Sequence, residues 1–536
     1  MGKQIELLDC TLRDGAYITG SHFGTPAIRG IIKNMQDARV DIIECGWLKD
    51  KAHEAGTSFY HVPSDMEQYL LARDPGVTYV AMIDWDRYDT DHLPEFDGNS
   101  IDAVRVVFPH GKHREGVEVG RRIREKGYQV FFQAANTLAY SDTDLHDLAA
   151  YMNDFKPVSV SIVDTFGAMF EDDLDRIMDR LHAELSPEIR LGFHSHNNQQ
   201  LAFALSMHFV ERCVSLGRKC IVDATLCGMG RGAGNATTEL VASYLNRKQH
   251  GSYDLDAVMD AIDKYMQEFK ERYVWGYSTP YFIAGMYQCH VNNIAYLLNN
   301  HRTNAQDMRN IIASLSQADR RKYDYDLLEE KYLENQNRVV DDDDVMMALK
   351  QQFEGRKVLL LCPGRSLEEK QEQVKVYIEE QNPVVIGVNA VLPAYQYDYL
   401  FFVNHARYEY AREAYPDAFR QAVKLLLSNI KTEAGKDERI INFNHVTKRG
   451  WKYFDNPAIC ALRLLDRLDV GDIFIAGFDR FLTKYNESYA DASLPSVNPE
   501  DFEELNREIL EMYRDFKLTA RERTRVHFVT ESIFDV

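Results

Sequence analysis

The sequence lacks the features of several specialised protein classes. Its 536 residues contain no run of about 18 apolar residues, so we expect no membrane-spanning helix. The eight cysteines are scattered without a CxxC pair, which favours reduced, buried thiols over a disulfide framework. Residues 1–6 lack the apolar stretch of a secretory signal. We therefore expect a cytoplasmic protein.

Positive charge is also scarce. Lysine and arginine number 62 against 83 aspartate and glutamate residues, which gives a formal net charge of −21. Because contacts to phosphate need clustered basic residues, we expect no binding of nucleic acid. A hydrophobic fraction of 45% and a charged fraction of 27% are typical of globular proteins, and the length indicates two or three domains.

Short apolar runs alternate with longer amphipathic stretches over roughly the first 240 residues. The stretches 117–126 and 145–155, for example, have the spacing of helices that bury one face. Repeated strand–helix units predict an α/β fold with a closed parallel (β/α)8 barrel, or TIM barrel; a doubly wound open sheet is the alternative. The expected strands are 5–8, 42–45, 79–83, 103–108, 129–133, 159–163, 190–196 and 220–224.

A second α/β pattern follows the barrel. We expect a barrel domain at 1–250, a helical extension completing its active site at 251–352, and a Rossmann-like domain at 353–536. We interpret the acidic run 341–344 as the solvated start of a helix near the last boundary, in preference to a cation site. The expected strands of the last domain are 358–362, 384–388, 400–403, 440–443 and 473–476.

Three polar clusters follow expected barrel strands, where the active sites of such barrels lie. In the first, Asp14 stands beside Arg13, so that a carboxylate and a guanidinium could serve a metal and a substrate together; a salt-bridged loop is the alternative. In the second, His194 and His196 are two positions apart on one strand and therefore point to the same side. Two imidazoles and a carboxylate suit a divalent metal ion.

The third cluster is the glycine-rich segment 227–235 after the eighth expected strand. Glycines allow the backbone to approach a ligand closely, and loops at this position often hold anions; a mobile turn is the alternative. From it we expect Gly230, Arg231 and Gly232 to bind substrate, together with Thr165 after the sixth expected strand.

These clusters together resemble the DRE-TIM metallolyase (HMGL-like) superfamily, with Arg13, Asp14 and Glu44 at the positions that name it. The resemblance covers roughly residues 5–300. It implies that Asp14, His194, His196 and Asn235 hold a divalent ion of Mn, Mg or Co, with Zn as an option. It also implies that Arg13 neutralises an enolate oxygen and that Glu44 belongs to the catalytic set.

Within the superfamily, the segments 223–230 and 284–287 are most similar to the 4-hydroxy-2-oxovalerate aldolases. That branch carries a proton-transferring histidine where this chain has Tyr17. His22, His290 and Tyr287, which that branch places in the site wall, are further candidates for proton transfer, and each has a structural role as its alternative. The identity of the acid or base stays open at this point.

In the last domain a strand leads through segment 363–367 into a helix, and segments 387–389 and 403–404 follow later strands. This arrangement resembles the Rossmann-like cores of bacterial surface-glycan transferases, which bind a nucleotide-linked substrate near the first loop. A plain strand-to-helix turn is the alternative for that loop. The loop has fewer glycines than a dinucleotide-binding fingerprint, which argues against a NAD site. The expected ligand-binding residues of this domain are Gly364, Arg365, Ser366, Asn389 and Asn404.

The leading functional hypothesis is a metal-dependent aldolase that acts on a pyruvate-like 2-oxo acid and an aldehyde, in surface-polysaccharide biosynthesis. A nucleotide-linked sugar would be the partner of the last domain, and we expect a homo-oligomer. The first alternative is a Claisen-type synthase that uses an acyl-CoA, as isopropylmalate and citramalate synthases do. The second is a barrel that has lost its chemistry and serves as a binding or scaffold module.

Overall fold

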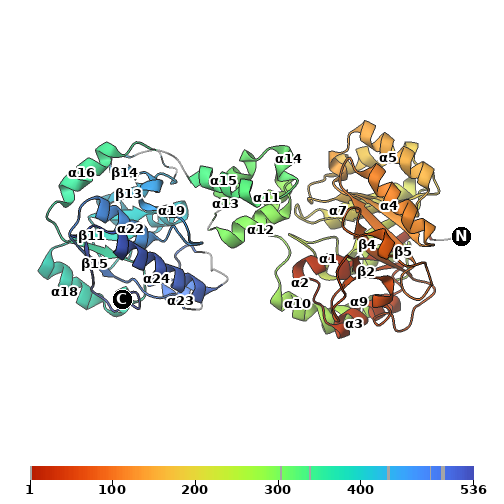
Figure 1. Cartoon of the computed structure of the whole chain (residues 1–536), viewed down its shortest axis with the longest axis horizontal. Coiled ribbons are helices and arrows are strands. Elements are labelled where there is room, and N and C mark those ends of the chain that lie inside the picture. The colour runs from red at the N-terminus through yellow and green to blue at the C-terminus, as the bar shows by residue number, and fades with distance from the viewer. Residues whose placement is uncertain are drawn as a thin grey trace. The chain divides into compact units, whose positions relative to one another are not determined.

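A computed structural model describes residues 3–301, 303, 305–336, 340–430, 432, 435–482, 484–496 and 501–535 (Figure 1). The chain forms two compact units, one of Met1–Ile294 with Gln317–Lys322 and the other of Ala295–Ser316 with Tyr323–Val536. The expected helical extension 251–352 is thus divided between the two units. Among the described residues, none of the helices combines the length and apolar character needed to cross a bilayer.

The first unit contains the predicted closed parallel barrel. β1 pairs with β2 on one side and with β9 on the other, which joins the two edges of the sheet. The short strand β3 (Phe59–Tyr60) extends β2 outside the barrel. The barrel strands are β1 (Ile5–Asp9), β2 (Ile42–Leu48), β4 (Thr78–Asp84), β5 (Ala103–Phe108), β6 (Gln129–Ala134), β7 (Ser159–Asp164), β8 (Arg190–Ser195) and β9 (Cys220–Ala224).

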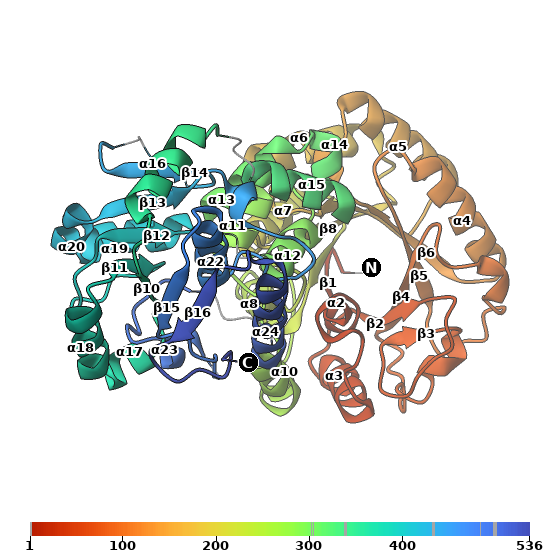
Figure 2. The same cartoon turned by 60° about the vertical axis from the view of Figure 1, so that its left-hand side comes forward.

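Helices cover the outside of the barrel, and Figure 2 shows α4 and α5 on the outer side of β5 and β6. Each helix buries one stripe: in α4, Val117 and Ile123 are buried among exposed charged residues. An apolar layer from six strands fills the interior with Leu8, Ile42, Val80, Ala103, Phe131 and Ile221. The main outer helices are α3 (Thr25–Asp37), α4 (His113–Glu125), α5 (Asp142–Phe155), α6 (Glu171–Glu184), α7 (Ala202–Ser215) and α8 (Thr238–Arg247).

The second unit is built around a parallel sheet with strand order β14-β13-β12-β11-β10-β15-β16. The order reverses between β10 and β15, which is where open α/β sheets form a crevice beyond their strand ends. Two of these strands, β13 and β16, were not expected from the sequence. The strands are β10 (Val358–Leu361), β11 (Val384–Val388), β12 (Tyr399–Phe402), β13 (Val423–Leu427), β14 (Glu438–Ile441), β15 (Asp472–Ala476) and β16 (Arg525–Phe528).

The acidic run does begin a helix, α16 (Asp343–Phe353). It is not wholly solvated, because Asp342 is buried and accepts a hydrogen bond from the Asn442 amide at 2.8 Å. The other long helices of this unit are α18 (Gln371–Gln381), α19 (His405–Ala414), α22 (Pro457–Arg467) and α24 (Phe502–Thr519).

Candidate active site

A set of buried charged side chains lies beyond the carboxyl ends of the barrel strands. Arg13 and Asp14 belong to the one-turn helix α1 (Thr11–Asp14), directly after β1. Arg13 Nη1 donates to Asp14 Oδ1 at 2.7 Å, and Arg13 Nε donates to Glu44 Oε2 of β2 at 2.8 Å. The predicted trio of Arg13, Asp14 and Glu44 is therefore in direct contact.

Two further buried residues, which the sequence alone did not assign to the site, complete a closed ring of charges. Arg105 of β5 lies 2.9 Å from Glu44 Oε2 through Nη1 and pairs with Asp223 of β9 through Nη2. Asp223 Oδ2 is 3.2 Å from His194 Nδ1, and His194 Nε2 is 3.3 Å from Asp14 Oδ2. The ring runs through Asp14, Arg13, Glu44, Arg105, Asp223 and His194.

His194, in β8, and His196, just after it, have their rings held by neighbouring acceptors. His196 Nδ1 donates to the Asp164 carbonyl at 2.9 Å, since a carbonyl only accepts. His194 Nδ1 faces the Asp223 carboxylate. In both rings this leaves Nε2 as the nitrogen able to bind an ion, which is the usual arrangement of metal-binding histidines.

The electrostatics of the site favour a charged carboxylate beside a neutral imidazole. Burial alone would raise the pKa of Asp14, but the Arg13 guanidinium and His194 outweigh it and hold that pKa well below its usual range. Burial, followed by the nearby His194, lowers the pKa of His196 to about 3. Near neutral pH, Asp14 is thus ionised and His196 keeps its lone pair.

The residues around Asp14 fit a divalent ion. Asn235 Nδ2 donates to Asp14 Oδ2 at 2.7 Å, whereas Asn235 Oδ1 is buried without a hydrogen-bond partner among the described residues. Cys10, Asp14 and His194 each offer a ligand atom within 4.8 Å of the other two, and His196 does not belong to that group. Cys10 is the weaker ligand of these, because burial raises the pKa of its thiol well above the usual value and it donates to Ala224 O at 3.3 Å.

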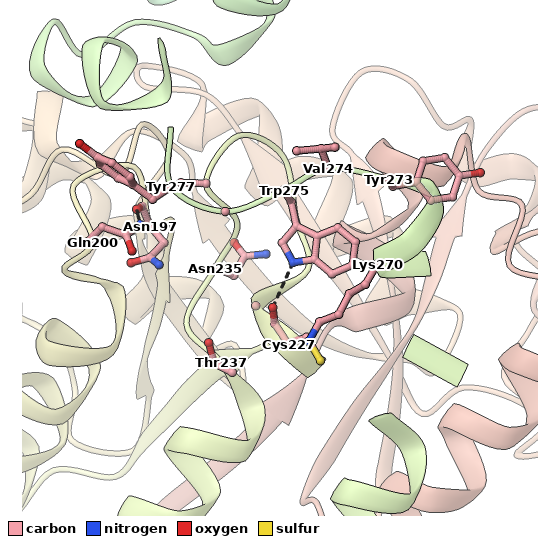
Figure 3. A pocket seen from close by; sticks show the side chains of 13 residues that line it. Asn197, Gln200, Cys227, Asn235, Thr237, Lys270, Tyr273, Val274, Trp275 and Tyr277 are labelled. Carbon is pink, nitrogen blue, oxygen red and sulfur yellow. Dashed lines mark hydrogen bonds between the residues drawn. The ribbon is translucent and has the colours of Figure 1, made fainter. Parts of the chain in front are cut away.

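The glycine-rich loop brings Asn235 to this place. A Cβ on Gly230 would lie 2.3 Å from Asn235 Nδ2, so only glycine lets the loop close on that amide. The loop also borders a cavity of about 390 Å³ (Figure 3). There Trp275 Nε1 donates to the Cys227 carbonyl at 3.0 Å, and the Lys270 side chain points toward Cys227.

The substrate-binding candidates divide into two groups. Arg231, on the loop, stacks its guanidinium 3.8 Å from the centre of the Tyr17 ring. Gly232 has φ +67°, and a Cβ there would meet Asn198 Oδ1 at 2.8 Å. Thr165 instead accepts a hydrogen bond from the Asn136 amide at 2.6 Å, which ties two loops together.

Of the four candidates for proton transfer, Tyr17 and His290 lie near the charged set, and Tyr17 is itself 39% exposed. Tyr17 packs edge-on against Trp47, whose indole donates to Arg13 O at 3.1 Å. The pKa of His290 is lowered to about 3, first by burial and then by the nearby Arg231 and His196. His22 is exposed and forms a backbone bridge with Thr57, and Tyr287 lies against Arg320.

In the second unit, the loop after β10 is engaged by the chain itself. The Ser366 amide and hydroxyl both donate to the Asp479 carboxylate, at 2.7 and 2.6 Å, and Arg365 Nη1 donates to the Glu487 carbonyl at 3.0 Å. Gly364 and Asn389 line a small cavity beside this loop. Asn389 and Asn404 line an adjoining cavity of about 380 Å³.

Known proteins match part of the chain. Residues 112–264 match the HMGL-like family model. The chain is 27% identical over 263 residues to the oxaloacetate decarboxylase of Mycobacterium tuberculosis, covering 48% of this chain and 74% of that protein. It is 28% identical over 286 residues to 4-hydroxy-2-oxovalerate aldolase 2 of Salinispora arenicola, covering 50% and 76%. Among solved structures, the HMG-CoA lyase of Bacillus subtilis is 15% identical with a TM-score of 0.41, covering 50% of this chain and 94% of that chain.

Proposed function

From the HMGL-like domain in its barrel and the charge ring around Asp14, we propose that the protein is a divalent-metal-dependent aldolase. It makes or breaks the carbon–carbon bond of a 4-hydroxy-2-oxo acid, with a 2-oxo acid such as pyruvate and an aldehyde as the partners. The observation that carries the proposal is the contact of Arg13 with the Asp14 carboxylate that faces His194 Nε2. A cation site and a fixed guanidinium thus lie side by side where negative charge would develop.

Each residue of the set has a separate task. An ion held by Asp14, His194 and His196, with Asn235 Oδ1 as a further ligand, would supply a Lewis acid for the carbonyl oxygen of the 2-oxo acid. Arg13 adds a fixed positive charge beside that oxygen, and Glu44 and Asp14 hold its guanidinium in one orientation. Asp164 O keeps the His196 ring in place.

We assign proton transfer in the condensation direction to Tyr17. Desolvation raises the pKa of its phenol to about 12, although Arg231 and Arg13 oppose the rise, so the hydroxyl carries its proton at neutral pH. His290 is a poorer donor, because its Nδ1 accepts from the Asn292 amide at 3.1 Å and its ring stays neutral. Tyr17→Phe should therefore lower turnover more than His290→Gln does.

The test is metal-dependent pyruvate release. The full chain is stripped with a chelator, reloaded with Mn, Mg, Co or Zn, and assayed on 4-hydroxy-2-oxo acids by coupling pyruvate to NADH oxidation. His196→Ala should abolish turnover, while His146→Gln, an exposed histidine on α5, should leave it unchanged. Unchanged turnover in His196→Ala would refute the metal site.

The same metal-reloaded chain can be assayed to distinguish the alternative functions. Pyruvate release from oxaloacetate would indicate a decarboxylase like the Mycobacterium tuberculosis relative. Thiol release from acetyl-CoA would indicate a Claisen-type synthase. A protein that binds no divalent ion would leave only the scaffold module. Light scattering of the purified chain tests the homo-oligomer that we also propose.

For the second unit we propose a nucleotide-linked sugar as ligand and a role in surface-polysaccharide biosynthesis, with a sugar-derived aldehyde for the barrel. Support comes from the crevice at the β10–β15 reversal, where both cavities share Asn389, Arg407, Pro457 and Tyr489. Arg407 is buried, with its guanidinium 4.7 Å from the centre of the Tyr489 ring. A cation on an aromatic ring suits a phosphate next to a flat base.

Because Asp479 already accepts from Ser366, we place this ligand on the Asn389–Arg407 side and not at the first loop. Calorimetry with a panel of nucleoside diphosphates and monophosphates tests the proposal. Arg407→Met should weaken binding at least tenfold, whereas Arg412→Met, on the exposed side of α19, should not. Equal affinity in both variants would contradict it.

A further inference from the structure

A second cluster of metal-binding side chains lies in the first unit, outside the ring described above. It consists of Asp50, His61 and His92, whose nearest ligand atoms all lie within 4.8 Å of one another. Asp50 follows β2, His61 follows β3, and His92 ends the 3-10 turn Thr90–His92 after β4. Three consecutive loops at one end of the barrel therefore meet at this point.

Hydrogen bonds to backbone carbonyls hold these loops together. The β2–β3 register opposes Leu48 to Tyr60, and the Lys49 amide donates to Tyr60 O at 2.8 Å. From the third loop, the Tyr88 hydroxyl donates to His61 O at 2.9 Å. The site is thus largely formed in advance, which lowers the entropy cost of binding.

The side chains present their ligand atoms toward one another. His61 Nδ1 donates to the Lys49 carbonyl at 3.2 Å, which leaves the lone pair of Nε2 for an ion. The Asp89 amide donates to Asp50 Oδ2 at 2.8 Å and fixes that carboxylate. Its Oδ1 is 2.7 Å from His92 Nδ1, and the His61 and His92 ring centres are 5.0 Å apart.

We propose that Asp50, His61 and His92 form a second site for one divalent transition-metal ion of the zinc type. Two imidazoles and one carboxylate favour Zn, Co, Ni or Cu over Mg and Ca, which prefer oxygen ligands alone. Three protein ligands leave a fourth tetrahedral position for water. The ion replaces the Asp50–His92 hydrogen bond and links the loops after β2, β3 and β4.

A comparison within the same barrel supports this choice. Glu171, Asp175 and His208 also lie within 4.8 Å of one another. They contain only one imidazole, and Arg212 Nε lies 3.1 Å from Asp175 Oδ1, so a guanidinium already occupies the place of a cation. We therefore expect no ion at that cluster.

The loop that holds Asp50 also borders the active site. Lys49, its neighbour, lies over the rings of Trp47 and Phe59, at 4.9 and 4.7 Å from their centres. Trp47 in turn donates to Arg13 O. An ion at Asp50 would therefore stiffen one wall of the catalytic face, and it should raise the melting temperature of the chain.

Metal stoichiometry tests the proposal independently of the proposed enzyme activity. The full chain, without an affinity tag and stripped of metal, is titrated with Zn²⁺ by calorimetry and with Co²⁺ by visible absorption. The His92→Gln variant, like Asp50→Asn, should bind one ion fewer than the unaltered chain. His208→Gln should bind the same number as the unaltered chain.

The comparison separates the two metal sites. If the active-site proposal holds, the unaltered chain binds two ions, His196→Ala and His92→Gln bind one each, and the double variant binds none. If only the active-site proposal fails, the counts are one for the unaltered chain and none for His92→Gln. Circular dichroism confirms that both Asp50 and His92 variants are folded. Equal stoichiometry in the unaltered chain, His92→Gln and Asp50→Asn would overturn the second site.

Discussion

Replacing Arg105 with methionine should destabilise the barrel far more than removing an ordinary ion pair. The side chain is 1% exposed and contacts both Glu44 and Asp223. At an effective dielectric constant of about 20, a single contact at 2.9 Å has a Coulomb energy of about 6 kcal/mol before desolvation. Because the substitution leaves two buried carboxylates without this cation, we expect the free energy of unfolding to fall by about 3–5 kcal/mol.

The assay is urea unfolding followed by tryptophan fluorescence, since Trp47, Trp85 and Trp275 all lie in the first unit. Arg73→Met is the matched control: its partner Asp102 and Arg73 itself are about one-quarter exposed, so the cost should be about 1 kcal/mol or less. Adding Asp223→Asn to Arg105→Met should recover part of the loss, because it removes one uncompensated charge. A loss for Arg105→Met no larger than that of the control would refute the reasoning.

Two further substitutions test local geometry. Ser141→Ala removes the capping box of α5 and should cost about 1 kcal/mol near neutral pH in urea unfolding. Hydrogen bonds from Ser141 lower the pKa of Asp144 to about 2. The stability that these bonds give to the ionised Asp144 is present above the unfolded pKa of 3.8 and is lost as the pH falls through about 2. A cost of Ser141→Ala that does not change with pH would contradict this reasoning. Gly230→Ala should displace Asn235 and lower turnover at least tenfold in a folded protein, whereas Gly471→Ala, whose Cβ meets nothing closer than 3.8 Å, should leave turnover unchanged.

The barrel could be predicted from the sequence because its strands are buried on both faces and read as continuous apolar runs. All eight expected strands coincide with barrel strands to within about three residues at either end. The prediction failed where this signal is weak. β16 is an edge strand of alternating exposed and half-buried residues, and β13 contains the buried Lys424, which interrupts the apolar run.

The site could be predicted only in part. The sequence could predict that Asp14 and His194 lie close together, because the ends of parallel strands converge in a barrel. In the structure, His194 Nε2 is 3.3 Å from Asp14 Oδ2. Arg105 was visible as a charged residue inside an apolar strand, but sequence does not show which strands face each other across the interior. The same limit applies to His290, whose approach to Arg231 and His196 depends on the fold of segments after the barrel.

The charge ring also constrains how the chain folds. Its members stand at positions 13, 14, 44, 105, 194 and 223, and its longest contact, between Asp14 and His194, spans 180 residues of sequence. Contacts of such long sequence separation form slowly. During synthesis, Arg105 leaves the ribosome before its partner Asp223. A collapse of the chain before that point would bury the Arg105 guanidinium without this carboxylate. Pairing β1 with β9 closes the barrel, and the contact of His194 with Asp14 closes the charge ring, so both depend on the same late long-range contacts.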